Sequence, residues 1–332
     1  MKVAVIGAGS WGTALANLLA GREHRVRIWA RESEVVESIN ESHENRLFLP
    51  GFELESGLLA HGELARVLQD AEMVLSASPS HAVREIATRV AAELDGGSPL
   101  IVSVSKGLEA ESLKPMTEVL EDVLPGKRIV ALSGPSFADE VCKRHPTTVV
   151  AASTDSEAAE AVQLAMASDF FRIYTSSDPL GVQLGGALKN VIAIASGLLD
   201  GLGLGYNSKA ALITRGLAEI ARLGQALGCD SMTFAGLAGM GDLMLTAFGP
   251  QSRNRSLGQE LATGRSLDEI LKKRVTVAEG VRTTRAAVLL GKKMGVELPI
   301  AQEVEQILFE DKEPRQALRD LMERGLKPEH WS

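Results

Sequence analysis

The sequence predicts a doubly wound, largely parallel α/β sheet in residues 1–178, followed by an all-helical domain in residues 179–332. Two observations predict this α/β plus all-α plan. Apolar strand-like segments alternate with segments of helical spacing as far as Asp178, which is typical of a doubly wound sheet. Beyond Asp178 the strand-like segments stop and long helical patterns follow. A chain of 332 residues is also long for one hydrophobic core.

The individual elements follow from apolar runs bounded by glycine or proline. Strands are expected where β-branched and apolar residues cluster, at 2–6, 25–29, 73–77, 100–104, 128–132, 147–151 and 170–174. Helical spacing occurs between them, at 13–19, 82–94 and 157–167. In the second half, helices are expected at 180–199, 208–227, 266–273, 281–294, 300–309 and 315–324. No flexible linker separates the halves, so we expect them to pack together around a cleft.

The first strand runs directly into Gly7-Ala8-Gly9-Ser10-Trp11-Gly12, a G-x-G-x-x-G turn that opens a helix. Here Gly7 makes the tight turn, Gly9 lets the backbone approach a pyrophosphate, and Gly12 lets the helix pack closely on the sheet. Free amides and the dipole at the helix N-terminus favour a bound phosphate. We therefore predict a Rossmann-type domain that binds a dinucleotide.

The end of the second strand indicates which dinucleotide binds. NAD-binding domains usually place a carboxylate about 20 positions after the motif. This chain has Arg31 there, followed by Glu32. A guanidinium suits the 2′-phosphate of NADP(H), so we expect NADP(H) to be preferred. In the alternative, Arg31 merely opens the next loop and Glu32 serves NAD(H); use of both cofactors stays open.

Composition argues against several classes of function. The net charge of −8 and an aromatic content of only 4% argue against nucleic-acid binding. No run approaches ~18 uninterrupted apolar residues, so we expect no membrane span. Cys142 and Cys229 lie far apart and no histidine pair has metal-ligand spacing, so we expect no metal and inert thiols. With no signal-peptide pattern, we expect a cytoplasmic protein.

Small polar residues follow five of the expected strands, at 7–10, 30–31, 78–80, 105–107 and 133–136. Open α/β sheets bind ligands outside the carboxyl ends of their strands. Arg31 and Lys106 add two cations to these segments. We therefore expect an anion-binding crevice at this edge.

Further segments form a recognisable series along nearly the whole chain. They are 7–16 (GAGSWGTALA), 105–109 (SKGLE), 133–138 (SGPSFA), 184–191 (LGGALKNV), 236–243 (GLAGMGDL), 252–255 (SRNR) and 277–280 (VAEG). Together they resemble the bacterial-type NAD(P)-dependent glycerol-3-phosphate dehydrogenases. The resemblance implies a 6-phosphogluconate-dehydrogenase-like fold. It also implies hydride transfer that interconverts dihydroxyacetone phosphate and sn-glycerol 3-phosphate for glycerophospholipid synthesis.

The resemblance also implies roles for individual residues. Lys189 matches the proton acceptor of alcohol oxidation, which is the donor in the reverse direction. The substrate-binding positions match Lys106, Gly134, Ser136, Lys189, Asp242, Ser252, Arg253 and Asn254. The cofactor-binding positions match Ser10, Trp11, Arg31, Lys106, Ala138, Arg253, Val277 and Glu279, beside the three motif glycines. Residues 248–251 (FGPQ) depart from the family's Cys-Thr-containing stretch, although Ser252-Arg253-Asn254 is intact.

The residues alone leave alternatives open. A lysine in an apolar helix such as Lys189 often extends its ammonium to solvent; held in a cleft near a cation, it would have a lowered pKa that suits a general base. Asp242 is either a helix N-cap or a partner of the substrate hydroxyl or of Lys189. Ser252 is either a plain helix cap beside solvated arginines or, with Arg253 and Asn254, a phosphate receptor.

Two other functions compete with the one that the resemblance implies. One is a related two-domain dehydrogenase of a 3-hydroxy acid or keto acid, in which Arg253 would bind a carboxylate. The other is a non-catalytic NADP(H) sensor, which needs neither a base nor a second anion site and is therefore disfavoured by Lys189 and Asp242. The apolar helices of the second half are compatible with a homodimer.

Overall fold

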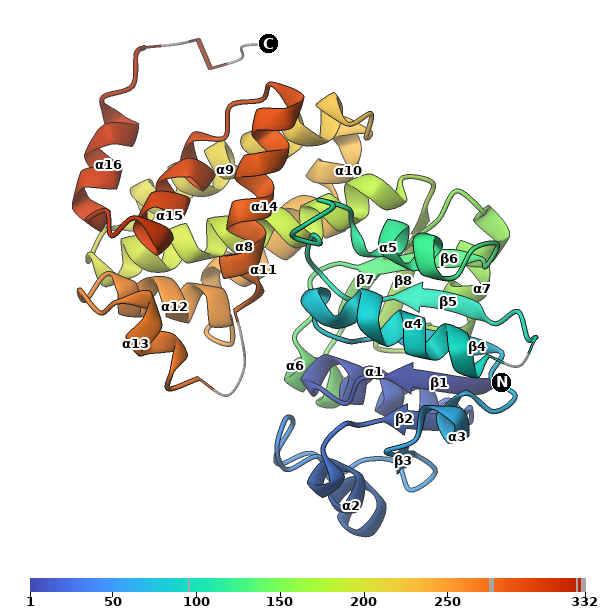
Figure 1. The fold of residues 1–332 in the computed structure, drawn as a ribbon. Helices are drawn as coiled ribbons and strands as arrows, with labels where there is room; N and C mark the ends of the chain where they lie inside the picture. Colours follow the sequence, from blue (N-terminus) through green and yellow to red (C-terminus); the bar gives the residue numbers. More distant parts are fainter. Residues whose placement is uncertain (95, 275–277, 327, 330–332) are drawn as a thin grey trace.

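The computed structural model describes residues 1–94, 96–274, 278–326 and 328–329. In this part of the chain one sheet has the strand order β3-β2-β1-β4-β5-β6-β7-β8 (Figure 1). Its strands are β1 (Lys2–Ile6), β2 (Arg25–Trp29), β3 (Leu59–His61), β4 (Met73–Ser76), β5 (Leu100–Ser103), β6 (Ile129–Ser133), β7 (Thr147–Ala152) and β8 (Phe171–Ser176). Neighbouring strands are parallel except β6 and β7, which are antiparallel.

Helices cover both faces of this sheet. They are α1 (Ser10–Ala20), α2 (Ser33–Ser42), α3 (Leu64–Leu68), α4 (Val83–Glu93), α5 (Met116–Val123), α6 (Ala138–Cys142) and α7 (Ser156–Met166), with the short turn η1 (Ser80–Ala82) before α4. Val3 and Val5 of β1 pack into the core on one face, whereas Ala4 and Ile6 pack into the core on the other. Burial on both sides explains why the central parallel strands β1, β4 and β5 are almost continuously apolar.

The second half is entirely helical within the described residues (Figure 1). Its elements are α8 (Pro179–Gly201), α9 (Tyr206–Ala226), α10 (Ser231–Ala235), the π-turn η2 (Leu237–Gly241), α11 (Asp242–Phe248), α12 (Arg253–Leu261), α13 (Leu267–Leu271), α14 (Glu279–Met294), α15 (Pro299–Phe309) and α16 (Pro314–Met322). The predicted fold class is therefore confirmed: a Rossmann-type domain is followed by a helical domain.

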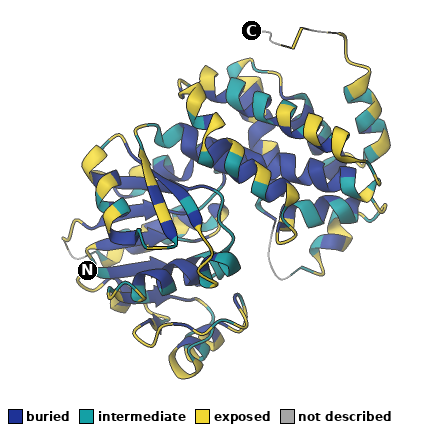
Figure 2. Ribbon diagram, turned by 180° about the vertical axis from the view of Figure 1, so that it is seen from behind, coloured by how far each residue is buried: buried dark blue, intermediate teal, exposed yellow. Residues whose placement is uncertain are grey.

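The long helix α8 forms the centre of the helical domain. Pro179 suits its first turn, and the carboxylate of Asp178 caps it by accepting a hydrogen bond from the Gly181 amide (2.8 Å). By length and composition α8 could cross a membrane, yet its apolar window is completely buried inside the protein. Figure 2 shows the same contrast, with a buried centre and exposed outer helices. Hence α8 is a core helix.

Small side chains allow the start of α8 to pack closely against the sheet. Ala131, Val150 and Ala152 of β6 and β7 form one buried cluster with Val182 of α8 and Ala238 of η2. Short side chains on both sides bring the helix backbone close to the strands. This contact places the middle of α8 beside the carboxyl end of β6.

Candidate active site

The glycine-rich turn joins β1 to α1 at the carboxyl edge of the sheet. Gly7 has a φ of +119°, which favours glycine. A Cβ atom at Gly12 would overlap the carbonyl oxygen of Gly7, whereas the space around Gly9 is open. No described side chain caps α1 at Gly9, so the first-turn amides, beginning with Ser10 and Trp11, are available to a phosphate. This geometry fits a dinucleotide pyrophosphate.

A buried asparagine that the sequence analysis did not single out holds this turn in place. Asn45 is fully buried, and its Nδ2 atom donates to the Ala8 carbonyl (2.8 Å) and to the Thr13 hydroxyl (2.8 Å). Its Oδ1 atom accepts from the Phe48 amide (3.0 Å). No motif marks Asn45, because its partners come from distant parts of the chain.

Arg31 lies just after β2, at the sheet edge where the sequence analysis expects the adenosine ribose. Its side chain is 82% exposed, and its Nε and Nη2 atoms both donate to Oε1 of Glu32 (3.1 and 2.8 Å). The two residues considered for ribose recognition therefore lie together, paired with each other.

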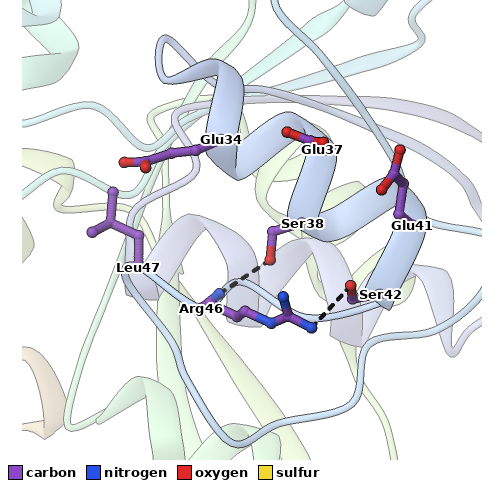
Figure 3. A pocket seen from close by; sticks show the side chains of 7 residues that line it. All are labelled: Glu34, Glu37, Ser38, Glu41, Ser42, Arg46 and Leu47. Atoms are coloured by element: carbon purple, nitrogen blue, oxygen red, sulfur yellow. Dashed lines mark hydrogen bonds between the residues drawn. The ribbon is translucent and has the colours of Figure 1, made fainter.

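A broad hollow runs along α2 (Figure 3). It is lined by Glu34, Glu37, Ser38, Glu41, Ser42, Arg46 and Leu47. Arg46 donates to the hydroxyl of Ser42 (3.1 Å) and to the carboxylate of Glu44 (3.3 Å). Three glutamates in the lining oppose a bound phosphate, and none of the predicted site residues lies there.

The carboxyl ends of β4, β5 and β6 meet the helical domain. Ser80, after β4, donates from its hydroxyl to Oε2 of Glu279, the first residue of α14 (2.5 Å). Lys106, after β5, donates to the carbonyl of Gly134, after β6 (3.0 Å). The Ser136 hydroxyl donates to the same carbonyl (3.0 Å). The predicted site residues Lys106, Gly134, Ser136 and Glu279 therefore gather along one edge of the sheet, together with Ser80.

The start of α6 also contacts the helical domain. Ala138 is the first residue of α6, and the ring of Phe137 before it lies where a Cβ atom on Gly249 would stand. This contact brings the 133–138 segment against the loop that precedes α12. Val277, expected to bind the cofactor, lies outside the described residues.

Lys189 lies in the middle of α8 and is only 6% exposed, so it does not extend to solvent. Its Nζ atom donates to Oδ1 of Asp242 and to the hydroxyl of Thr246 (2.8 Å). The other Asp242 oxygen accepts from Nζ of Lys106 (2.6 Å). One carboxylate thus connects a lysine from the sheet edge with a lysine from α8.

These surroundings change the acidity of Lys189. Burial lowers its pKa to about 7, an effect that the Lys106 ammonium reinforces and the Asp242 carboxylate opposes. A group with a pKa near neutrality can both take up and release a proton at ordinary pH. The amine therefore has the acidity that a general acid–base group requires.

Asp242 is not the N-cap of its helix, because Gly241 occupies that position and Asp242 begins α11. Of the alternatives drawn from the sequence, the partnership with Lys189 is the one present here. Thr246 follows one helical turn later and donates from its hydroxyl to the Asp242 carbonyl (2.7 Å). The sequence analysis missed Thr246, although the i, i+4 spacing from Asp242 could have indicated it.

Ser252 caps α12, since its hydroxyl accepts a hydrogen bond from the Arg255 amide (3.2 Å). Arg253 is exposed at the same helix end, although burial of its guanidinium lowers its pKa, an effect that the Glu279 carboxylate opposes. A helix N-terminus beside a partly desolvated guanidinium can receive an anion. The capping role of Ser252 and the expected phosphate role are thus compatible.

Asn254 connects three helices. Its Nδ2 atom donates to Oδ1 of Asn190 (2.9 Å), and its Oδ1 atom accepts from the Gly280 amide in α14 (3.0 Å). Asn190 is the neighbour of Lys189 on α8. The N-terminus of α12 is therefore fixed beside the buried lysine.

In the described residues no group of three or more His, Cys, Asp or Glu side chains is arranged to hold a metal ion.

Family models match both halves of the chain. Residues 2–159 match the N-terminus, and residues 178–319 the C-terminus, of NAD-dependent glycerol-3-phosphate dehydrogenase. The chain belongs to this family. A curated relative from Citrifermentans bemidjiense, named as an NAD(P)+ glycerol-3-phosphate dehydrogenase, is 50% identical over 99% of this chain and 98% of its own. A relative of the same name from Myxococcus xanthus is 51% identical over 99% of both chains.

Solved structures agree with the family. The crystal structure of glycerol-3-phosphate dehydrogenase from Coxiella burnetii has a TM-score of 0.93 and 38% identity, covering 97% of this chain and 98% of that chain. A ketopantoate reductase from Ralstonia eutropha shares the fold, with a TM-score of 0.61 and 19% identity over 97% of this chain and 100% of that chain. The family expected from the sequence motifs is confirmed, and the chain is an NAD(P)-dependent oxidoreductase.

Proposed function

We propose that this chain interconverts dihydroxyacetone phosphate and sn-glycerol 3-phosphate with NADP(H) or NAD(H). The observation that carries the proposal is Lys189, buried at the meeting point of the two domains with its pKa lowered to about 7 and bound to Asp242. Relatives that match the whole chain carry the corresponding enzyme name. The reaction would supply the backbone of glycerophospholipids in the cytoplasm.

The chain's own residues would handle the proton that accompanies hydride transfer. Bound nicotinamide supplies or accepts the hydride at C2 of the substrate. In oxidation, the neutral Lys189 amine accepts the hydroxyl proton; in reduction, the ammonium donates it to the forming alkoxide. Asp242 and Thr246 orient the amine, and Lys106 keeps its pKa low while its own ammonium favours negative charge on the substrate oxygen.

The phosphate group of the substrate would bind at the start of α12. Arg253 offers a planar set of donors, and the first-turn amides behind the Ser252 cap offer more. The hydrogen bond from Asn254 to Asn190 holds the N-terminus of α12 at a fixed position relative to Lys189. A phosphate there would leave the carbonyl carbon of a three-carbon substrate near the buried amine.

The remaining expectations belong to the same proposal. Residues 1–178 hold the cofactor and residues 179–332 supply the base and the phosphate site; the strand β8 ends at Ser176 and α8 begins at Pro179. Arg31 favours NADP(H) over NAD(H). We expect a homodimer, and light scattering of the purified protein should give the mass of two chains.

The test is the initial rate of NADPH oxidation with dihydroxyacetone phosphate, repeated with NADH at the same concentration. We expect turnover with both, faster with NADPH. The Lys189→Ala variant should lose turnover by orders of magnitude while its NADPH affinity stays close to that of the parent. Turnover of a keto acid in place of dihydroxyacetone phosphate would assign the chain to the related two-domain dehydrogenases instead.

A further inference from the structure

A second ion cluster lies directly behind the start of α12. Asp200, near the end of α8, forms ion pairs with Lys209 of α9 (2.5 Å) and with Nε of Arg255 on α12 (2.6 Å). The side chains are largely removed from solvent: Lys209 is 7%, Asp200 17% and Arg255 20% exposed. Two cations share one carboxylate, so the cluster carries a formal charge of +1.

Backbone packing fixes the position of this cluster. Helix α12 lies along α8 (Figure 1), and glycines form the contact. A Cβ atom on Gly197 of α8 would overlap the carbonyl of Arg255, and one on Gly258 of α12 would overlap the carbonyl of Ile194. Such close contact leaves α12 no freedom to slide, so Arg255 and Asp200 keep a constant separation.

The cluster lies close to the end of α12 that carries the proposed phosphate site. Arg255 is the third residue of α12, and side chains in a helix lean toward its N-terminus. The Lys209 ammonium lies 5.0 Å from the ring of Phe248, just before the loop that leads into Ser252. A largely buried charge without a counter-ion is costly, and a bound anion nearby would balance it.

We propose that Asp200, Lys209 and Arg255 form a positioning cluster that strengthens binding of the substrate phosphate at residues 252–254. Its ion pairs hold the first turn of α12 against α8, and its surplus positive charge adds to the helix dipole at the same end. The inference rests on the proposed function, because it takes the phosphate site to be at α12. It assigns a role to Lys209 and Asp200, which none of the sequence motifs includes.

A set of variants tests whether the net charge of the cluster determines the KM for the substrate. The cluster carries +1 in the parent and in Lys209→Arg, 0 in Lys209→Met, and +1 again in the double variant Lys209→Met with Asp200→Asn, where Arg255 stands alone. We expect Lys209→Met to raise the KM for dihydroxyacetone phosphate about tenfold, with a smaller fall in kcat. Lys209→Arg and the double variant should return the KM to within about threefold of the parent.

Lys312 provides a matched control, since it forms ion pairs with Glu303 and Asp320 far along the chain, between α15 and α16. Lys312→Met should leave the KM unchanged. If Lys209 had a purely structural role, the double variant would have a KM for dihydroxyacetone phosphate as high as that of Lys209→Met, or higher. Thermal melts followed by circular dichroism separate misfolded variants from weak binders. An unchanged KM in Lys209→Met would overturn the proposal.

Protection by inorganic phosphate gives a readout that does not need turnover. Phosphate that binds only the folded state raises the melting temperature, and at a fixed phosphate concentration the rise is larger the tighter the binding. We expect a larger rise for the parent and the double variant than for Lys209→Met, and little rise for Arg253→Ala. If the rises in melting temperature follow this order but the parent does not reduce dihydroxyacetone phosphate, the proposed function fails and the cluster assignment stands. Equal rises in the parent and Lys209→Met would refute the cluster assignment even in an active enzyme.

Discussion

The ammonium of Lys189 and the carboxylate of Asp242 form an ion pair that solvent hardly reaches, with 7% and 1% of the two side chains exposed. The second oxygen of Asp242 is held by Lys106, from the other domain. The carboxylate cannot turn away from Lys189 without breaking that second contact. The position of the amine is therefore fixed jointly by the sheet edge and by α8.

The pH dependence of the reaction should differ between its two directions. Burial lowers the pKa of Lys189 to about 7, so the amine is mostly neutral above that pH and mostly protonated below it. Oxidation of glycerol 3-phosphate requires the neutral amine, and its kcat should rise as the pH increases through about 7. Reduction requires the ammonium, and its kcat should fall over the same range. Profiles of kcat in both directions, measured at saturating cofactor, check this. Parallel profiles would exclude Lys189 as the titrating group.

Asp242→Asn should lower kcat by about 10²–10⁴-fold, because the amine loses the anion that orients it and stabilises its protonated form. Thr246→Val removes only one hydrogen bond to Lys189 and should cost about tenfold in kcat. The matched control is Asp230→Asn, which changes a carboxylate that caps α10. Steady-state kinetics of the three variants measure the loss of kcat in each, which should be largest for Asp242→Asn and absent for Asp230→Asn. A kcat for Asp242→Asn within twofold of the parent would contradict this assignment.

Arg31→Asp should shift the cofactor preference toward NADH, because a carboxylate repels the 2′-phosphate and can accept from a ribose hydroxyl. We expect the ratio of kcat/KM for NADPH to that for NADH to fall more than tenfold. Arg66→Asp serves as the control, since Arg66 is an exposed cation on α3 whose side chain is 67% exposed. If both variants change the ratio equally, the effect is one of net charge and Arg31 does not recognise the 2′-phosphate.

Glu219 predicts a pH dependence of stability that is separate from catalysis. This buried residue of α9 accepts from the Ile300 amide at the start of α15 (2.9 Å), and burial raises its pKa from 4.5 to about 7. Between these two pH values the unfolded chain is ionised at this residue while the folded protein holds a proton. The free energy of unfolding should therefore fall as the pH rises from about 4.5 to 7, by up to about 3 kcal/mol.

Glu219→Gln should remove that dependence and stabilise the protein at pH 8, because no charge then has to be buried. Urea unfolding at pH 5 and pH 8 measures both effects. The exposed Glu310→Gln is the control and should follow the parent at both values. If Glu219→Gln and the parent lose the same stability between pH 5 and 8, another group controls this pH dependence.

Much of the fold could be predicted because strand and helix periodicities are local. The expected helix at 180–199 corresponds to α8, and the expected strand at 25–29 corresponds to β2. The strand β3 was missed because Leu59–His61 has only three residues. The reversed direction of β7 follows from its short connection: between β6 and β7 the only helix is α6, with five residues, which is too short for the usual parallel crossover.

Prediction of the site was limited by long-range contacts. Sequence motifs indicated Lys189 and Asp242, but neither spacing nor composition could show that Lys106 reaches the same carboxylate, 136 positions away. Asn45 lies outside every motif, and its partner Ala8 becomes a neighbour only after folding. Ser80 was expected at the crevice, but its contact with Glu279, 199 positions away, could not be foreseen. Arg255, considered as a solvated residue, is held by Asp200 instead.

The burial of α8 also has a consequence during synthesis. The helices packed against it include α9, α11, α12, α14 and α15, and all of them follow it in the chain. At about 5–20 residues per second, a ribosome needs roughly ten seconds to proceed from Gly201 to Phe309. During that interval α8, which has the composition of a membrane span, is not yet packed against all of these helices. Nascent chains halted before α14 should therefore bind hydrophobic-segment chaperones that the finished protein does not.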